Sequence, residues 1–167
     1  THVPRTLLAV CPNSLSVIRS ALRAAKRWDS PVKFAATLNQ VDIDGGYTGL
    51  TQYELVRFIH SEAARIHLNV PVIIAIDHGG PWLKDLHARE KWLFEKTMEA
   101  VKKSFEAAIA AGYDLIHVDP TVDIARLPPG VVPGFERSLS CQRWCGRPFG
   151  PCRRRGHLIP VRPSLVS

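Results

Sequence analysis

The apolar run at residues 72–76 constrains the fold of this chain most, because four of its five residues are β-branched. A short run of this kind predicts a strand that is buried on both faces, as in a parallel sheet. Two glycines and a proline at positions 79–81 end the strand. We therefore expect Asp77 and His78 at the carboxyl end of a central parallel strand, which is the edge where α/β proteins bind ligands.

The Asp77–His78 pair has two interpretations. A carboxylate at a strand end is partly desolvated, so its pKa can suit proton transfer, and an adjacent imidazole can bind a divalent metal. Alternatively, Asp77 caps the turn that follows, and His78 is a polar residue with ordinary hydrogen bonds. The pair alone does not decide between these interpretations, so the ends of the other strands matter.

Expected strands and helices alternate along the chain. Ser14 or Asn13 precedes one helical pattern, and Thr51 with Glu54 has the spacing of a capping box before the next. This alternation predicts a parallel α/β sheet with right-handed crossovers and about four βα units. The expected strands cover about residues 6–10, 32–38, 72–76 and 115–118, and the expected helices about residues 15–27, 51–68, 82–87 and 90–111.

Polar residues follow three of these strands: Asn39 and Gln40, Asp77 and His78, and Asp119. Successive side chains in a strand point to opposite faces. Asn39, Asp77 and Asp119 each continue one side of their own strand. If those sides face the inside of a barrel, the three side chains converge at one end of it.

Charge divides the chain into two parts. The chain has 22 Lys and Arg against 15 Asp and Glu, and the whole excess lies in residues 137–167, which hold seven Arg and no acid. We predict a folded domain at residues 1–136, whose balanced charge indicates no polyanionic partner, and a basic tail at residues 137–167. No apolar run is long enough to span a membrane, and no signal peptide is evident, so we expect a cytoplasmic protein without a membrane partner.

The tail is rich in Arg, Pro, Gly and Cys and has no helical or strand period. One interpretation is a site for zinc or nucleic acid, although the ligand spacing differs from the usual paired CxxC pattern. The composition favours instead an unstructured segment translated out of frame, and we do not expect a nucleic-acid partner. The candidate ligands of the tail are Cys141, Cys145, Cys152 and His157, beside the arginines at 153–155.

Four ordered motifs together resemble a known family. They are Asn39-Gln40, the Gly-Gly-Tyr-Thr-Gly at 45–49, the Asp-His-x-Gly-Pro at 77–81, and the Ile-His-Val-Asp at 116–119. Over roughly residues 5–130 the chain resembles the accessory, non-catalytic subunit of class II tagatose-bisphosphate aldolases. The resemblance implies a TIM barrel, a role in ketohexose bisphosphate metabolism, and a catalytic zinc-dependent aldolase subunit as partner.

The resemblance also implies roles for individual residues. His78 corresponds to a zinc ligand of catalytic class II aldolases and Asp77 to their proton donor. Asp119 is a second candidate catalytic carboxylate because it is expected on the same rim. A zinc site needs three protein ligands. The other histidines of the domain (His60, His67, His87 and His117) are expected on helices or within a strand, with no evident mate for His78. The expected contacts to a sugar phosphate are Asn39, Gln40, Gly45, Gly46, Tyr47, Thr48, Gly79 and Gly80.

The length of the chain gives a further expectation. A TIM barrel takes roughly 250 residues and eight strands, whereas this chain has 167 residues. We expect a partial barrel that ends near residues 130–138 and is inactive alone. Its edge strands and open apolar face favour self-association or a partner. The alternative is an enzyme, a metal-dependent sugar-phosphate aldolase or epimerase that uses Asp77 and His78.

Overall fold

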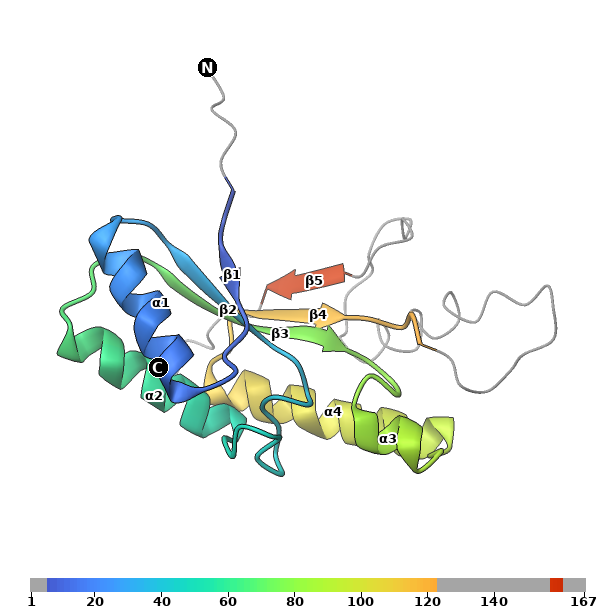
Figure 1. Cartoon of the computed structure of the whole chain (residues 1–167). Helices are drawn as coiled ribbons and strands as arrows, with labels where there is room; N and C mark the ends of the chain where they lie inside the picture. The colour runs from blue at the N-terminus through green and yellow to red at the C-terminus, as the bar shows by residue number, and fades with distance from the viewer. Residues whose placement is uncertain (1–5, 123–156, 161–167) are drawn as a thin grey trace, which may run out of the picture.

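A computed structural model describes residues 6–122 and the backbone of residues 157–160. Strands and helices alternate as the sequence predicts, which confirms the α/β class (Figure 1). The elements are β1 (Ala9–Val10), α1 (Leu15–Arg27), β2 (Val32–Ala36), α2 (Gln52–Arg65), β3 (Val72–Gly79), α3 (Asp85–Arg89), α4 (Phe94–Ala111), β4 (Leu115–Val118) and β5 (His157–Pro160).

One sheet has the order β1-β2-β3-β4-β5. The first four strands are parallel, and each pairs with the next one along the chain, which is the order of neighbouring strands in a (β/α) barrel. In the register, Ala35 lies opposite Ala75, and Ala75 lies opposite Leu115. The described part of the chain therefore has the strand order expected of a partial barrel.

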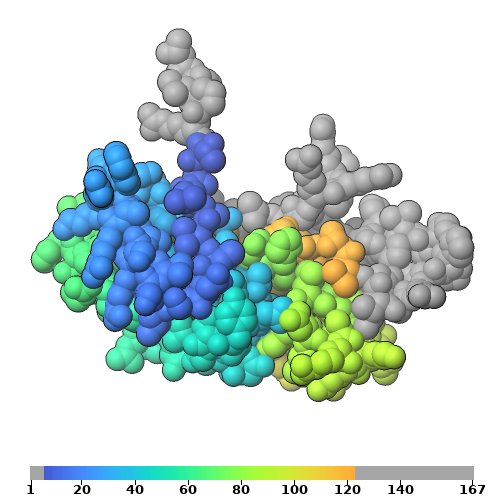
Figure 2. All heavy atoms as spheres, in the orientation of Figure 1, coloured from blue at the N-terminus to red at the C-terminus, as the bar shows by residue number. Residues whose placement is uncertain are grey.

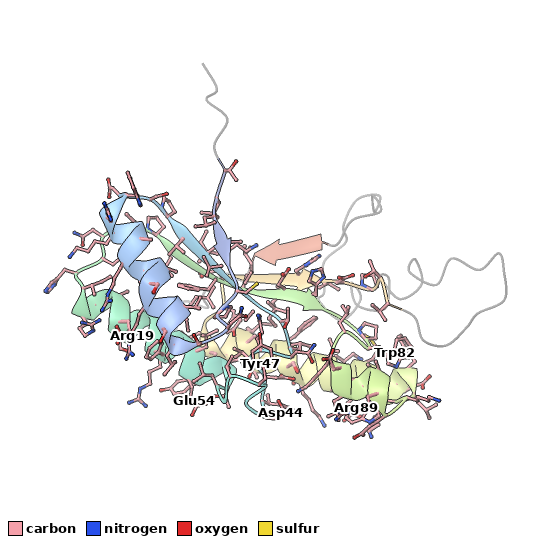
Figure 3. All side chains as sticks on the ribbon, viewed as in Figure 1. Arg19, Asp44, Tyr47, Glu54, Trp82 and Arg89 are labelled. Carbon is pink, nitrogen blue, oxygen red and sulfur yellow. The ribbon has the colours of Figure 1, made fainter. Side chains whose placement is uncertain are left out.

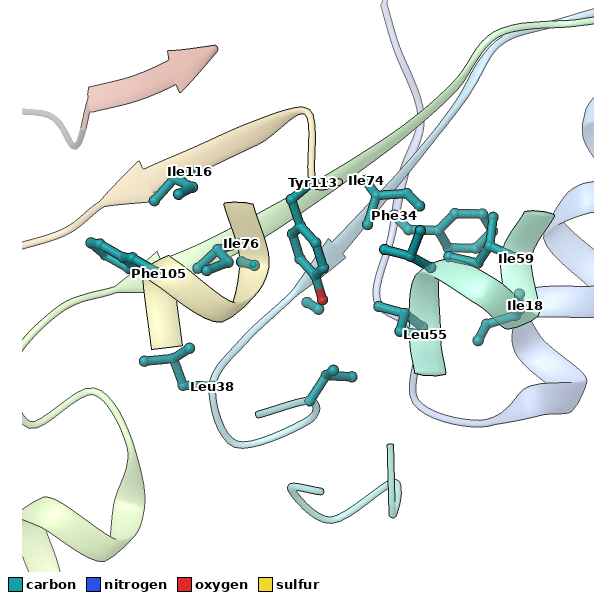
Figure 4. Packing of buried hydrophobic residues seen from close by; sticks show 14 of the residues in the cluster. Ile18, Phe34, Leu38, Leu55, Ile59, Ile74, Ile76, Phe105, Tyr113 and Ile116 are labelled. Atoms are coloured by element: carbon teal, nitrogen blue, oxygen red, sulfur yellow. The ribbon is translucent and has the colours of Figure 1, made fainter. Parts of the chain in front are cut away.

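Helices α1, α2 and α4 lie on one side of the sheet (Figure 1). Alternate strand residues, among them Phe34, Ile74 and Ile116, point to that side and are buried against the helices. Figure 4 shows Phe105 of α4 and Tyr113 packed among them. The intervening residues, among them the buried Ala35 and Ala75, point to the opposite side of the sheet. The apolar core therefore holds the strands in place from the helix side, and the opposite side carries the polar strand ends.

The helix boundaries follow local signals. The Ser14 side chain accepts a hydrogen bond from the N–H of Val17, and Thr51 with Glu54 completes the predicted capping box. The helix predicted from residue 90 begins only at Phe94, because Lys91 has a φ of 51° and interrupts the helical path. The segment before it forms the separate short helix α3.

The predicted division at residues 136 and 137 lies outside the described residues, and so do Cys141, Cys145 and Cys152. Within the predicted tail, only the backbone of β5 is described. It pairs antiparallel with β4, at a place where the sequence pattern predicts no strand. No helix in the described ranges is long and apolar enough to cross a membrane.

Candidate functional site at the carboxyl ends of the strands

The end of β3 is irregular. Its pairing with β4 shifts register between Ile76 and Gly79, and His78 has a φ of 52°. In a regular strand, His78 would point to the helix side, opposite Asp77. A register shift of this kind redirects side chains. Here it places Asp77 and His78 together at the rim, as the sequence position of the pair suggests.

Two carboxylate–imidazole pairs join β3 to β4. His78 Nδ1 lies 2.6 Å from Asp119 Oδ2, and His117 Nδ1 lies 3.2 Å from Asp77 Oδ1. The two imidazole rings have centroids 5.3 Å apart. We call Asp77, His78, His117 and Asp119 the rim cluster. The structure thus brings together three of the residues that the sequence predicts for the site, and it adds His117.

Charge and burial set the protonation of this cluster. The hydrogen bond to Asp119 raises the pKa of His78 above its ordinary value, against the effect of partial burial. Burial works to raise the pKa of Asp119, but hydrogen bonds from His78 and Thr121 hold it below its usual range. Asp119 is 3% exposed, whereas the His78 side chain is 54% exposed. Asp119 therefore stays a carboxylate and orients an imidazole that solvent can reach.

Asp77, His78 and His117 fit a divalent metal. Each offers one ligand atom, and these atoms lie within 4.8 Å of one another. Because Asp119 occupies His78 Nδ1, Nε2 is the nitrogen left for a ligand, and it lies 3.9 Å from Asp77 Oδ2. A metal-bound histidine commonly donates its second N–H to a carboxylate in this way. Two imidazoles and a carboxylate form a ligand set used by zinc and other divalent metals.

His117 is therefore the second histidine that can join His78 in binding a metal. The sequence places His117 within a strand but gives it no role. The signal that could identify it is the alternation of β4, because His117 lies two residues before Asp119 on the same side. Ala75 is paired with Leu115, which sets Asp77 and His117 across from each other. Sequence alone predicts the side, but the partner depends on register.

Asn39 occupies a different part of the rim. It makes its hydrogen bonds to the segment after β3: Asn39 Nδ2 donates to the Leu83 carbonyl at 3.3 Å and to Asp85 Oδ1 at 3.0 Å. The backbone N–H of Asp85 donates to Asn39 Oδ1 at 2.8 Å. Asn39 thus connects two loops of the rim instead of pairing with Asp77 or Asp119.

The rim loop, residues 39–50, follows β2 and makes hydrogen bonds to Asn13 in the segment after β1. Gln40 Nε2 and the Tyr47 hydroxyl both donate to Asn13 Oδ1, the second at 2.9 Å. Thr48 Oγ1 donates to the Gln40 carbonyl at 2.7 Å. Tyr47 is 63% exposed and lies at the surface near Asp44 (Figure 3). Asn13, expected only as a helix cap, is therefore part of the site, and Ser14 is the cap.

The predicted site glycines have structural reasons to be glycine. A Cβ on Gly80 would lie 1.7 Å from the Asp119 carbonyl oxygen, and one on Gly79 would lie 2.5 Å from Phe105 Cε1. Gly46 has a φ of 51°, and a Cβ at this position would overlap the Gln40 carbonyl. The absence of a Cβ lets each of these backbones approach its neighbour closely, while contact of the glycines with a substrate stays a prediction.

A buried lysine joins the segment after β3 to the rim loop. Lys84 Nζ lies 2.7 Å from Asp42 Oδ2 and 2.6 Å from Asp44 Oδ2. Asp42 also accepts a hydrogen bond from Gln52 Nε2 at 2.9 Å. Burial works to lower the pKa of Lys84, but hydrogen bonds to the two carboxylates hold it above its ordinary value. Lys84 thus stays an ammonium ion, which is not the state of a Schiff-base nucleophile.

Two curated relatives are similar to this chain in sequence. The D-tagatose 6-phosphate 4-epimerase of Agrobacterium fabrum is 34% identical over 129 residues, which are 75% of this chain and 28% of that protein. The D-tagatose-1,6-bisphosphate aldolase subunit GatZ of Klebsiella pneumoniae is 31% identical over 132 residues, 77% of this chain and 29% of that protein. The chain therefore spans less than a third of the length of these curated relatives.

A solved structure has the same arrangement of elements. The crystal structure of a probable tagatose 6-phosphate kinase from Sinorhizobium meliloti 1021 matches with a TM-score of 0.67 and 28% identity, over 85% of this chain and 35% of that one. The model of the D-tagatose-1,6-bisphosphate aldolase subunit GatZ/KbaZ-like family matches residues 1–132, which include all four parallel strands and the whole rim cluster. The chain belongs to the D-tagatose-1,6-bisphosphate aldolase subunit GatZ/KbaZ-like family.

Proposed function

We propose that this chain serves a class II tagatose-bisphosphate aldolase as an accessory subunit in the metabolism of ketohexose phosphates. The observation that carries the proposal is the family match, which takes in every described βα unit. The Klebsiella relative is itself named as a subunit of this aldolase. The partner is then a catalytic class II aldolase subunit, and the predicted cytoplasmic location belongs to the same proposal.

The test is to express the chain with a catalytic class II tagatose-bisphosphate aldolase subunit and to measure two properties. We expect the two chains to elute together in gel filtration, and we expect slower heat inactivation of the aldolase. An unrelated α/β protein of similar size is the control for non-specific protection. If the chain only self-associates, and the aldolase neither binds it nor gains lifetime, the accessory role is wrong.

The rim cluster supports a second candidate function, metal-assisted chemistry on a sugar phosphate. The Agrobacterium relative is named as an epimerase that acts on tagatose 6-phosphate. Asp77, His78 and His117 would hold zinc or another divalent metal, which would polarise a carbonyl or hydroxyl oxygen of the sugar. Asp119 orients His78 and keeps a negative charge beside it. The predicted group for proton transfer with the substrate is Asp77, through the carboxylate oxygen that is not part of the ligand set.

Metal content tests this candidate without an activity assay. We expect about one zinc or cobalt ion per chain after equilibration, and Co²⁺ should show the d–d absorption of a site of low coordination number. His78→Ala and His117→Ala should each lose the ion, whereas His60→Ala, an exposed histidine on α2, should keep it. Equal metal content in all four proteins would contradict the site.

Ligand binding tests the remaining predicted contacts. Four of the predicted contacts belong to the rim loop, namely Asn39, Gln40, Tyr47 and Thr48. Tyr47 is the most exposed of them. Calorimetry with tagatose 1,6-bisphosphate should show binding that weakens in Tyr47→Phe, which removes only the hydroxyl that contacts Asn13. Tyr53→Phe, an exposed tyrosine on α2, is the matched control. No binding to the wild-type chain would leave the rim without a substrate role in this chain.

A further inference from the structure

Residues 80–93, which we call the strap, connect β3 to α4 and lie beside the rim loop (Figure 2). Two sets of contacts join them. Lys84 of the strap binds Asp42 and Asp44 of the rim loop. The backbone and side chain of Asp85 form a pair of hydrogen bonds with Asn39, of 2.8 and 3.0 Å. The position of the rim loop therefore depends on the strap.

His87 lies in the interior of the strap and is 3% exposed. Its ring stacks on Trp92, with centroids 4.6 Å apart and planes 23° apart, and its carbonyl accepts the N–H of Trp92 at 2.9 Å. Among the described residues, no hydrogen-bond partner exists for His87 Nδ1, although the atom is buried. A neutral imidazole can leave one nitrogen as an unused acceptor, but an imidazolium has two N–H donors that must both be satisfied.

Within residues 6–122, the charged groups that act on His87 are Lys84 of the strap, Asp42 and Asp44 of the rim loop, and Lys96 of α4. Lys96 Nζ lies 3.6 Å from the Trp92 ring centroid. Both carboxylates already bind Lys84. Burial, and then the charge of Lys84, lower the pKa of His87 below its ordinary value. The protonated form of His87 is thus favoured when the ring is in solvent and disfavoured when the ring is packed in the strap.

We propose that His87 is an acid-sensitive latch, and that its protonation releases the strap from the rim loop. The latch depends on neither a metal nor a partner, so it is independent of the proposed function. When the strap is released, His87 is exposed and has a pKa near its ordinary value of about 6.5. When the strap is packed, the pKa of His87 is lower. Between these two values the released population rises about tenfold for each unit by which the pH falls.

Hydrogen exchange of the whole chain in EDTA, read by mass spectrometry at about pH 7.5 and 5.5 and corrected for intrinsic rates, tests the latch. We expect protection of residues 80–93 to fall at the lower pH, by at most about tenfold, while α1 keeps its protection. His87→Phe retains a ring against Trp92 without a titrating group, so it should abolish the change. His60→Gln should leave the change intact. Equal protection at both pH values, or a change that persists in His87→Phe, would overturn the latch.

A titration of the wild-type chain covers the case in which His87→Phe does not fold. The ring protons of His87 should titrate in NMR spectra with a midpoint below about 6.5, and the Trp92 indole should shift with the same midpoint. A His87 midpoint at or above that value, or a Trp92 signal that does not follow it, would overturn the latch equally well.

Discussion

At the scale of single residues, the site depends on a few short contacts that fix side-chain direction. Asp119 holds His78 by one nitrogen at 2.6 Å and leaves the other nitrogen for a ligand. Gly80 allows the chain to pass directly beside the Asp119 carbonyl. The pair and the glycine are therefore two parts of one local arrangement, which joins the ends of β3 and β4.

Replacing Asp119 with Asn should lower the pKa of His78 toward its ordinary value, because the carboxylate that stabilises the imidazolium is gone. A histidine with a raised folded pKa adds stability that is complete below about pH 6.5 and is lost as the pH rises through the folded pKa. NMR titration of the His78 ring in EDTA measures the shift, and the exposed His60 is the internal reference. An unchanged His78 midpoint would show that Asp119 does not act on it.

Gly80→Ala should destabilise the chain by about 3 kcal/mol, because its Cβ would overlap the Asp119 carbonyl and force the two strand ends apart. Gly49→Ala is the matched control, since Gly49 has a φ of 75° but open space around its Cβ position. The control should cost only about 1–2 kcal/mol, the strain of left-handed backbone. Urea denaturation measures both values, and equal losses would contradict the steric explanation.

At the scale of elements, the loops after β2 and β3 are held to each other by charge as well as by backbone hydrogen bonds. Lys84 binds two carboxylates of the rim loop while its side chain is only 9% exposed. Removing one member of such a buried pair leaves the other charge uncompensated. The order of the rim loop therefore depends on this lysine, which is the N-cap residue of the short helix α3.

Lys84→Ala should cost about 3–5 kcal/mol, because Asp42 would remain buried without its cation. Lys103→Ala is the control, because its ion pair with Glu99 on α4 lies in solvent and should contribute less than about 1 kcal/mol. Thermal unfolding followed by circular dichroism compares the two. A loss for Lys84→Ala as small as that for Lys103→Ala would mean that the buried ion pairs do not hold the rim loop.

At the scale of the whole molecule, three helices cover one face of the sheet, and the rim cluster lies at the carboxyl ends of the strands (Figure 1). The core between sheet and helices supports the strands from the side on which the helices lie. Phe105 is central to this core, because it is 2% exposed and also lies where a Cβ on Gly79 would be. Packing of α4 is thus connected directly to the end of β3.

Phe105→Ala should destabilise the chain by about 3–5 kcal/mol through the cavity that it leaves in the core. It should also loosen β3 near Gly79, which hydrogen exchange of that strand would detect. Ile109→Ala on the same helix is the control, since Ile109 is 46% exposed and should cost much less. Similar losses for the two variants would show that α4 is not anchored through Phe105.

Much of this arrangement could be predicted from local signals. The β-branched run of β3 and the capping box at Thr51 each act over a few residues, and the structure confirms the elements they predict. The sequence also predicts a break between the two helices that follow β3, but the position of that break, with α4 beginning at Phe94 instead of residue 90, could not be predicted in the same way. It depends on the left-handed backbone at Lys91 and on the burial of His87, neither of which is visible as a periodic pattern.

The sequence by itself determined the order of the four parallel strands and the helices between them, and the position of Asp77, His78 and Asp119 at strand ends. Periodicity and turn residues, which carry this information, are local properties of the chain. Only the tertiary structure decided that His117 joins them, that Asn39 binds the strap, and that Lys84 finds two carboxylates some forty residues away. These contacts depend on strand register and loop packing. Register and packing are set by the core as a whole, so no short stretch of sequence specifies them.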